Sequence, residues 1–448
     1  MTVDQRPHTA AREVLRWRAI GAHSGSARRG TRGSRRRPWR LALGVVAAVA
    51  AVSGVLTVGF GTAEYRRLSG NLRSVPLYAG ATGNAGTEQV DAFGDAPINL
   101  LVIGSDTRDN AADCAIGHDC GPGANADVEM LVHIAADRSS ATVMSIPRDT
   151  VTRLPACRDP RTGAVTAAGY GQINATLTAG PGCTVAAVHA LTGVPIDHFA
   201  MVDFAGVISM SDAIGGTPVC VSANVYDTYS HLKLSMGDHV LKGAAALAFL
   251  RSRHAFGDGS DLGRTGVQHQ FLASMLRTVK DAGSFADPTR MLALAEAASK
   301  ALTVDTGLGS IPELLGLAAD LNKVPTDRIT LVTMPTAPDP ADPNRVVPGA
   351  AAPALFQAIA EDRALATRAS PSGPSTASSE ASSSSATSPG TAAASTSGST
   401  PPADAQPLSA AETTSCAAVS TARAVRLDGA LLTPTQAYDR ATSVPDSA

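Results

Sequence analysis

The feature that most constrains this chain is a run of 20 residues without a charged side chain, LALGVVAAVAAVSGVLTVGF, at 41–60. A helix of that length, at about 1.5 Å per residue, is about 30 Å long, which matches the hydrocarbon thickness of a bilayer. Residues 35–37 and Arg40 are all arginine and stand directly before the run. The positive-inside rule then keeps the N-terminus in the cytoplasm. We therefore predict a single-pass protein of the cell membrane, with a transmembrane helix at 41–60 and an extracytoplasmic body.

A cleaved signal peptide is the competing interpretation of this run. The basic arm is long and the apolar run exceeds the usual core of a signal peptide, so we favour a retained anchor. Residues 1–40 contain 11 Arg, Asp4 and Glu13, for a net charge of +9, and the rest of the chain carries −11 because the total is −2. The body is therefore acidic, which disfavours a protein that binds nucleic acid.

All six cysteines lie beyond the apolar run, in a compartment where disulfides would form. We expect three pairs: Cys114 with Cys120 across a short loop, Cys157 with Cys183, and, by default, Cys220 with Cys416. Other connectivities are possible for six cysteines. A zinc site that uses His118 between Cys114 and Cys120 is an alternative, although no CxxC or HExxH spacing supports it.

Beyond residue 97, short apolar runs that end in turns alternate with segments of helical periodicity. Such runs are typical of buried strands. We predict strands at 98–106, 129–136, 140–149 and 329–335, helices at 262–282, 286–302, 309–321 and 351–363, a strand followed by a helix within 198–216, and a helix leading into an extended segment at 241–253. This alternation indicates an α/β fold in which helices flank a central sheet.

Composition divides the chain into distinct parts. A basic cytoplasmic arm (1–40), the transmembrane helix (41–60) and a Gly-, Ala- and Thr-rich stalk (61–92) precede one folded domain at 93–365. Residues 366–414 are almost wholly Ser, Thr, Ala, Pro and Gly, and they cannot bury enough apolar area to offset their chain entropy. We expect them to be a disordered linker. The C-terminal tail, 415–448, is too short for an independent domain unless it is attached to the body.

Charged residues stand where the apolar elements of this domain are expected to end. Ligands of open α/β sheets gather at the carboxyl ends of strands, so these residues are candidates for one site. The candidates are Asp106, Asp127, Arg148 and Asp149 around the first three strands, and Arg251, Arg253, Asp261, Arg264 and Gln268 farther along the chain. If 250–253 is extended, Arg251 and Arg253 share one face and converge on one anion.

The candidates combine guanidinium groups with carboxylates and include no arrangement typical of a catalytic Ser, Cys or His. Guanidinium forks and a carboxylate-bound Mg²⁺ neutralise the charge of a phosphoryl-transfer transition state, and carboxylate oxygens suit this hard cation. The Arg content weakens the inference, since the chain has 32 Arg and 5 Lys overall. Structural alternatives stay open: a cap for Asp106, a loop position for Asp127, a local ion pair for Arg148 with Asp149, and solvated surface for Arg251 and Arg253.

Seven segments, in this order, resemble the LytR–CpsA–Psr family: NLLVIGSDTR, DVEMLVHIAADR, SATVMSIPRDT, GQINATL, DHFAMVDFAGVISMSDAIGG, LKGAAALAFLRSRH and DLGRTGVQHQF. The resemblance covers about 97–275 and extends to 365. It implies an α/β core of that family's type and a membrane protein that faces the cell wall. It also implies a Mg²⁺-dependent phosphotransferase that moves a glycopolymer from a polyprenyl-pyrophosphate carrier onto peptidoglycan, with pyrophosphatase as a side activity.

The resemblance also implies roles for the candidates. It makes Asp106 and Asp127 magnesium ligands, and it assigns Arg148, Asp149, Arg251, Arg253, Asp261, Arg264 and Gln268 to the catalytic and pyrophosphate-binding set. Two positions depart from the family pattern, because Asn125 and Val267 stand where the family often has Arg. The rival hypothesis is a non-catalytic scaffold that binds polyprenyl phosphate or a wall polymer, and these two departures favour it.

Overall fold

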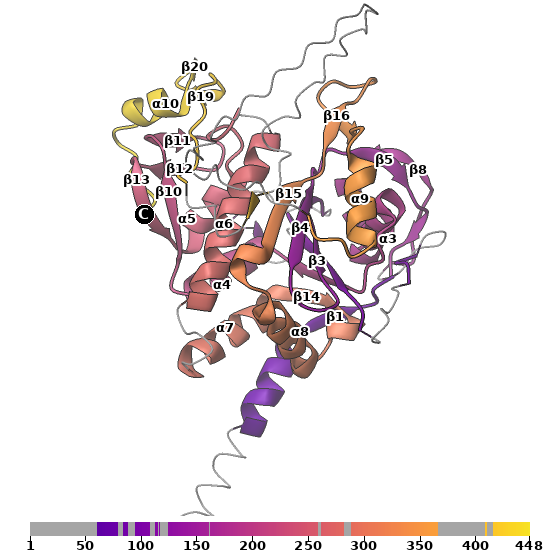
Figure 1. Ribbon diagram of the computed structural model, residues 1–448. Coiled ribbons are helices and arrows are strands. Elements are labelled where there is room, and N and C mark those ends of the chain that lie inside the picture. The colour runs from indigo at the N-terminus through magenta and orange to yellow at the C-terminus, as the bar shows by residue number, and fades with distance from the viewer. Residues whose placement is uncertain are drawn as a thin grey trace, which may run out of the picture. The chain divides into compact units, whose positions relative to one another are not determined.

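The centre of the molecule is a sheet built from the apolar runs that the sequence sets between turns (Figure 1). The computed structural model describes residues 61–78, 84–87, 95–107, 113–114, 116, 124–160, 162–258, 261–281, 288–365, 408–409 and 415–448. From Thr62 onward the chain forms one unit.

The sheet has eight strands in the order β1-β14-β9-β2-β3-β4-β15-β18. Their bounds are β1 Arg73–Val75, β2 Ile98–Ser105, β3 Ala126–Ile134, β4 Ala141–Ile146, β9 His198–Val202, β14 Leu302–Asp305, β15 Ile329–Thr333 and β18 Leu408–Ser409. The pairs β1–β14, β2–β9 and β4–β15 are parallel, and the other neighbours are antiparallel. The sheet is therefore mixed.

Helices cover both faces of this sheet. Figure 1 shows α3 and α9 on one side of β3, β4 and β15, and α5 and α6 on the other. The helices are α3 Pro181–Thr192, α4 Phe204–Ala213, α5 Gly243–Arg251, α6 Asp261–Asp281, α7 Pro288–Ala301, α8 Ile311–Lys323, α9 Ala352–Ala360 and α10 Pro434–Arg440. Alternate side chains of a strand point to opposite faces, so Leu131 packs in the cluster with α3 and α9, whereas Met130 packs against α6.

Short hairpins and 3₁₀ turns complete the described part of the fold. The hairpins pair β5 Val151–Leu154 with β8 Gly169–Gln172, β6 Cys157–Arg158 with β7 Val165–Thr166, β10 Thr217–Val221 with β13 Gly237–Leu241, β11 Val225–Asp227 with β12 Leu232–Leu234, β16 Thr336–Pro338 with β17 Val346–Pro348, and β19 Val425–Leu427 with β20 Ala430–Leu432. The 3₁₀ turns are η1 Ile173–Ala179, η2 Thr306–Leu308 and η3 Thr326–Arg328.

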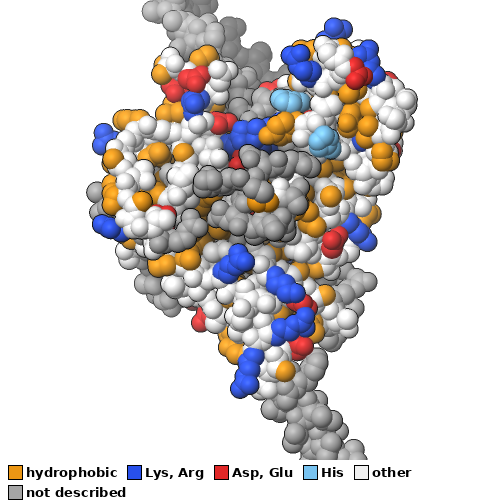
Figure 2. Space-filling model, turned by 180° about the vertical axis from the view of Figure 1, so that it is seen from behind, with side chains coloured by type: hydrophobic (Ala, Val, Ile, Leu, Met, Phe, Trp, Pro, Cys, Tyr) orange, Lys and Arg blue, Asp and Glu red, His pale blue; other side chains and the backbone are white. Residues whose placement is uncertain are grey.

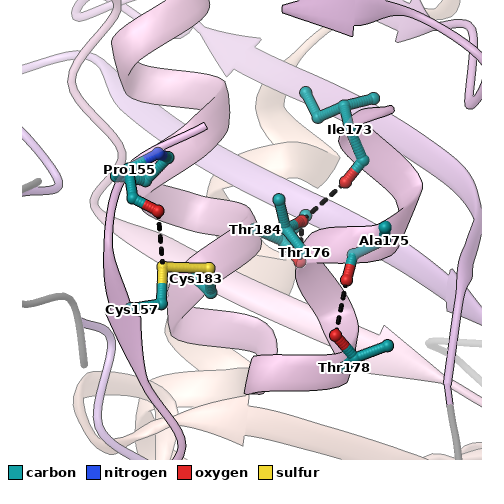
Figure 3. Close-up of a disulfide and its surroundings, with 8 residues drawn as sticks. All are labelled: Pro155, Cys157, Ile173, Ala175, Thr176, Thr178, Cys183 and Thr184. Carbon is teal, nitrogen blue, oxygen red and sulfur yellow. Dashed lines mark hydrogen bonds between the residues drawn. A yellow bond between two sulfur atoms is a disulfide. The ribbon is translucent and has the colours of Figure 1, made fainter. Parts of the chain in front are cut away.

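Two predicted disulfides are confirmed, Cys157–Cys183 and Cys220–Cys416. Figure 3 shows the first beside a pair of buried threonines, in which Thr176 Oγ1 lies 3.0 Å from Thr184 Oγ1. Cys114 is also disulfide-bonded, which removes the thiolate that a zinc site would need. His118 and Cys120 lie outside the described residues.

The structure corrects two expectations about where the folded region begins and ends. Residues 61–71 are helical and β1 joins the sheet, so the folded region begins within the stretch expected to be a stalk. β18 pairs with β15 inside the expected linker, because Leu408 and Ser409 extend the edge of the sheet. The predicted helix that leads into an extended segment at 241–253 is confirmed, because α5 ends at Arg251 and the chain is extended at Ser252.

The proposed membrane anchor is not part of this description. Residues 41–60 lie outside the described residues, as do the basic arm and most of 366–414. In the part of the chain that the structure describes, no helix has both the length and the apolar character that a membrane crossing requires.

Candidate functional site

Asp106 and Asp127 lie at the same corner of the sheet. β2 and β3 are antiparallel neighbours, and a bulge at the end of β2 shifts the register so that Ser105 opposes Ala126. Asp106 N donates to Asn125 O over 3.1 Å, and Asn125 N donates to Asp106 Oδ1 over 2.6 Å. The chain reversal thus brings the two predicted metal ligands, 21 positions apart, to one edge.

Arg148 joins this corner from the end of β4. Its Nη1 donates to Asp127 Oδ1 over 2.6 Å, and the Arg148 side chain is only 16% exposed. Asp149 turns toward the neighbouring hairpin, where its Oδ1 accepts a hydrogen bond of 2.6 Å from Gln172 Nε2. Arg148 Nε lies 3.5 Å from Asp149 Oδ2, so the guanidinium stands between the two carboxylates. Arg148 therefore forms the local ion pair with Asp149 and also contacts Asp127 in the shared cluster.

Arg251 and Arg253 approach the corner by different routes. An extended segment at 250–253 would place both side chains on one face, but Arg251 is the last residue of α5 and the chain becomes extended only at Ser252. Arg251 Cζ lies 4.6 Å from the centre of the Phe204 ring, at the start of α4. Arg253 Nη2 lies 3.8 Å from Asp127 Oδ1, and its Cζ lies 4.8 Å from the centre of the Tyr229 ring.

The first turns of α6 supply the remaining candidates. Arg264 is 4% exposed, and its Nη2 donates to Asp127 O over 3.2 Å. Gln268, one turn later, donates through Nε2 to Leu250 O over 3.4 Å. Asp261 is the first residue of the helix, and its predicted role stays a prediction. Asp127 is thus the common contact of Arg148, Arg253 and Arg264.

A cavity of about 200 Å³ opens beside this cluster, between the sheet and helices α4, α5 and α6. Arg251, Arg264 and Gln268 line it near the start of α6, together with Asp127. Farther along, its walls are apolar and include Val102, Met130, Val207, Met210, Phe271 and Met275. The face of the molecule drawn in Figure 2 carries basic side chains near its centre, with His side chains beside them. A polar mouth and apolar walls suit a ligand with a charged head and a hydrocarbon tail.

Two acids at the site, Glu129, which is buried, and Asp203, which is half-buried, were not singled out from the sequence. Glu129 is 1% exposed, and its burial, with the nearby Asp127 charge, raises its pKa well above the usual value. Asp203 lines the cavity and caps α4 by accepting a hydrogen bond of 2.8 Å from Gly206 N; burial, with the charge of Asp113, raises its pKa. Both groups are therefore more easily neutral than a free carboxyl. The sequence signal that could have identified Glu129 is an acidic residue within an otherwise apolar strand.

The donor set at the corner suits a hard cation. Carboxylate oxygens are preferred by Mg²⁺, which commonly binds through one or two carboxylates and completes its shell with water and substrate phosphates. Asp106 and Asp127 could supply such a pair. Within the described ranges, no cluster of three or more His, Cys, Asp or Glu side chains is placed to hold a metal by itself. The residues present therefore fit a magnesium ion that shares its ligands with a phosphate.

Fold and site together define an α/β protein with an apolar cavity that ends in a cluster of arginines around one aspartate. The model of the LytR_cpsA_psr family matches residues 68–361. The chain therefore belongs to the LytR–CpsA–Psr family, as the sequence resemblance predicted.

Individual relatives share part of the chain. The "Cell wall biosynthesis protein LcpA" of Corynebacterium glutamicum is 29% identical over 265 residues, which cover 54% of this chain and 50% of the relative. The "Polyisoprenyl-teichoic acid--peptidoglycan teichoic acid transferase TagU" of Bacillus cereus is 27% identical, covering 50% of this chain and 68% of that protein. The solved "LytR-Csp2A-Psr enzyme from Actinomyces oris" is 24% identical, with a TM-score of 0.48, covering 65% of this chain and 96% of that chain. This chain spans about half the length of LcpA.

Proposed function

We propose that this chain is a membrane-anchored phosphotransferase. It attaches a glycopolymer carried on polyprenyl pyrophosphate to peptidoglycan through a phosphodiester, and it releases polyprenyl phosphate. The observation that carries the proposal is the shared wall between the apolar cavity and the arginines around Asp127. The activity for which TagU is named, transfer of polyisoprenyl-linked teichoic acid to peptidoglycan, supports the same reaction class.

The reaction requires an anion-binding cluster next to an apolar cavity. The isoprenyl chain lies against the apolar walls, and the pyrophosphate lies among Arg148, Arg251, Arg253 and Arg264. A hydroxyl of peptidoglycan, by family likeness the C6 hydroxyl of N-acetylmuramic acid, attacks the glycan-side phosphorus. A new P–O bond to the acceptor forms, the P–O bond to the second phosphate breaks, and polyprenyl phosphate leaves. The guanidinium groups stabilise the negative charge on both phosphates as it develops.

The hydroxyl proton needs an acceptor, and Asp149 is our choice. Its carboxylate is fixed by Gln172 and lies beside Arg148, next to the phosphates as we orient them. Asp106 and Asp127 would hold Mg²⁺, which when bound supplies positive charge against phosphate oxygens. Gln268, held by Leu250 O, keeps the start of α6 against α5 and thereby helps to position Arg264.

The test uses the full chain in detergent micelles with a short polyprenyl pyrophosphate and Mg²⁺. Release of polyprenyl phosphate should fall by about 100-fold or more in Arg251→Ala and in Arg264→Ala, since each removes a contact to transition-state charge. Arg153→Ala is the matched control, because Arg153 is an exposed arginine that contacts Tyr170 on the β5–β8 hairpin and does not line the cavity. Near-normal release by both cavity variants would refute the assignment.

The second candidate is a non-catalytic scaffold that binds the lipid carrier or a wall polymer. Asn125 and Val267 favour it, because both stand where the family often has Arg. Val267 is 5% exposed, packs in the apolar cluster with Phe249 and Phe271, and is not among the residues that line the cavity. Tight binding of a polyprenyl pyrophosphate by the wild-type chain, with no Mg²⁺-dependent turnover, would favour the scaffold.

We also propose a topology for the whole chain: an arm at 1–40 in the cytoplasm, a single helix at 41–60 across the membrane, and the transferase domain outside. The run of uncharged residues behind a basic cluster supports this arrangement. Single cysteines introduced at Thr9 and at Asp342 in a cysteine-free chain should differ in labelling by an impermeant maleimide in intact cells. Labelling at position 342 but not at position 9 is expected, and the reverse would contradict the proposal.

A further inference from the structure

The backbone of Arg253 is held from inside the molecule by one carboxylate. Asp227, at the end of β11, is fully buried. Its Oδ2 accepts hydrogen bonds from Ser252 Oγ at 2.7 Å, from Arg253 N at 3.1 Å and from His254 N at 3.3 Å. Its Oδ1 accepts from Tyr229 N at 2.9 Å. One side chain thus holds both the loop that carries Arg253 and the backbone of Tyr229, whose ring packs against the guanidinium.

The same loop is held from outside by the C-terminal segment, residues 415–448. Residues 417–420 run between two distant parts of the chain and pair with both. On one side Ala417 N donates to Cys220 O over 2.8 Å, and the Cys220–Cys416 disulfide fixes this edge. On the other side Gly257 N donates to Ala418 O over 2.9 Å, and Ser420 N donates to Ala255 O over 2.8 Å. These contacts begin two residues after Arg253.

The rest of the C-terminal segment packs on the hairpin that contains Asp227. Figure 1 shows α10, β19 and β20 next to β11 and β12. The buried Lys233 of β12 donates through Nζ to Ala441 O, at the end of α10, over 2.8 Å, and it lies 4.7 Å from the centre of the Tyr438 ring. Tyr226 of β11 is buried in one apolar cluster with Val425 and Ala437. The segment therefore braces the hairpin as well as the loop.

We propose that Asp227 and the C-terminal segment 415–448 act together as a brace that positions Arg253 for the pyrophosphate. This inference rests on the proposed function, because it assigns the segment a part in binding the same ligand. The family match ends at residue 361, so segment 415–448 lies beyond the part of the chain that defines the family, whereas Asp227 lies within it. Arg253 is a flexible side chain, and a guanidinium binds a phosphate with less entropic cost when its backbone and its stem are already fixed.

Two full-length variants test the brace. Asp227→Asn replaces one of the two acceptor oxygens by an amide, and Cys220→Ser/Cys416→Ser releases the covalent attachment of the segment. Cys157→Ser/Cys183→Ser is the matched control, because it breaks the other disulfide, which joins β6 to α3. The probes are farnesyl pyrophosphate and farnesol, so that the contribution of the charged head is separated from that of the apolar tail.

We expect both brace variants to bind farnesyl pyrophosphate about tenfold more weakly, which corresponds to the loss of one good hydrogen bond to a charged group. Farnesol affinity should stay within twofold, because the apolar walls are untouched. Hydrogen exchange at 253–257 should also accelerate about tenfold or more in both variants and stay unchanged in the control. A purely structural role would weaken the binding of both ligands together.

Two outcomes would overturn the proposal. One is unchanged hydrogen exchange at 253–257 in both brace variants, which would mean that the loop does not depend on them. The other is faster exchange with an unchanged ratio of farnesyl pyrophosphate to farnesol affinity, which would mean that the brace does not position Arg253. Failure of the proposed function has a different signature, because the wild-type chain would then bind neither probe while the exchange measurement still reports on the brace.

Discussion

Arg148 donates a 2.6 Å hydrogen bond to Asp127, and neither side chain is much exposed to solvent. Asp127 belongs to β3, and Arg148 follows the antiparallel neighbour β4. Arg253 and Arg264 contact the same aspartate through its carboxylate and its carbonyl oxygen. Asp127 therefore organises the arginines, whatever else it binds. A single acid that aligns several guanidinium groups keeps their mutual repulsion low and directs them at one point.

The first prediction follows from this arrangement. Asp127→Asn should lower the release of polyprenyl phosphate by about 100-fold, because the arginines lose the charge that aligns them and the metal loses a ligand. The measurement is the rate at which polyprenyl phosphate is released at saturating Mg²⁺. Asp137→Asn is the control, because Asp137 lies in an exposed turn, where it accepts a hydrogen bond of 2.8 Å from Ser139 N. Equal rates in the two variants would contradict the role of Asp127.

The second prediction concerns the apolar cavity. Val207→Trp places a large ring from α4 into a space of about 200 Å³, so the Kd for a polyprenyl pyrophosphate should rise by about tenfold or more. Binding of inorganic pyrophosphate, which has no tail, should be unaffected. Leu315→Trp on α8 is the control, because Leu315 is 52% exposed. If Val207→Trp weakens both ligands equally, the cavity does not hold the tail.

Much of the fold could be predicted because the local signals agree with the packing. The runs that became β2, β4 and β15 are apolar and end in turns, and the periodic segments that became α6 to α9 were placed within a few residues of their bounds. The edge strands were missed for a physical reason. β1 and β18 are two or three residues long and depend on a neighbour in the sheet, so they have no periodicity of their own.

The sequence indicated which residues would cluster, but it did not indicate how each of them reaches the cluster. Residue type and position at the ends of apolar elements predicted Asp127, Arg148 and Arg264 as one group, and these residues meet in the structure. The placement of Arg251 in an extended segment at 250–253 was wrong, because helix α5 continues through residues 250 and 251. The hydrogen bond from Arg253 N to Asp227 could not be predicted from the sequence. It joins residues 26 positions apart, and only the packing of two elements brings them together.

A third prediction concerns pH. His269 is 2% exposed, and burial lowers its pKa from 6.5 to about 4, while its Nε2 lies 2.7 Å from Ser145 Oγ. The unfolded chain binds this proton at a higher pH than the folded chain, so stability is full above pH 6.5 and falls as the pH drops toward 4. At pH 4.5 this effect lowers the free energy of unfolding by about 2 to 3 kcal/mol relative to neutral pH.

Urea unfolding of the wild-type chain and of His269→Gln, at pH 7 and at pH 4.5, isolates this effect. Glutamine retains a polar group for Ser145 but does not titrate in this range. The loss of stability between the two pH values should be smaller in the variant than in the wild type by about 2 kcal/mol. Equal losses in the two proteins would show that His269 does not contribute to acid sensitivity.

The last prediction concerns the Cys157–Cys183 disulfide (Figure 3). The two cysteines are 26 positions apart, and the loop that they close includes β8 and η1. Cys157→Ala/Cys183→Ala should destabilise the fold by about 3 kcal/mol, because the unfolded chain regains the entropy of that loop. The free energy of unfolding in urea provides the measurement. Both cysteines are buried and neither lines the cavity, so farnesyl pyrophosphate affinity should not change. An unaltered unfolding midpoint in the double variant would mean that the packing around Thr176 and Thr184 holds this loop without the bond.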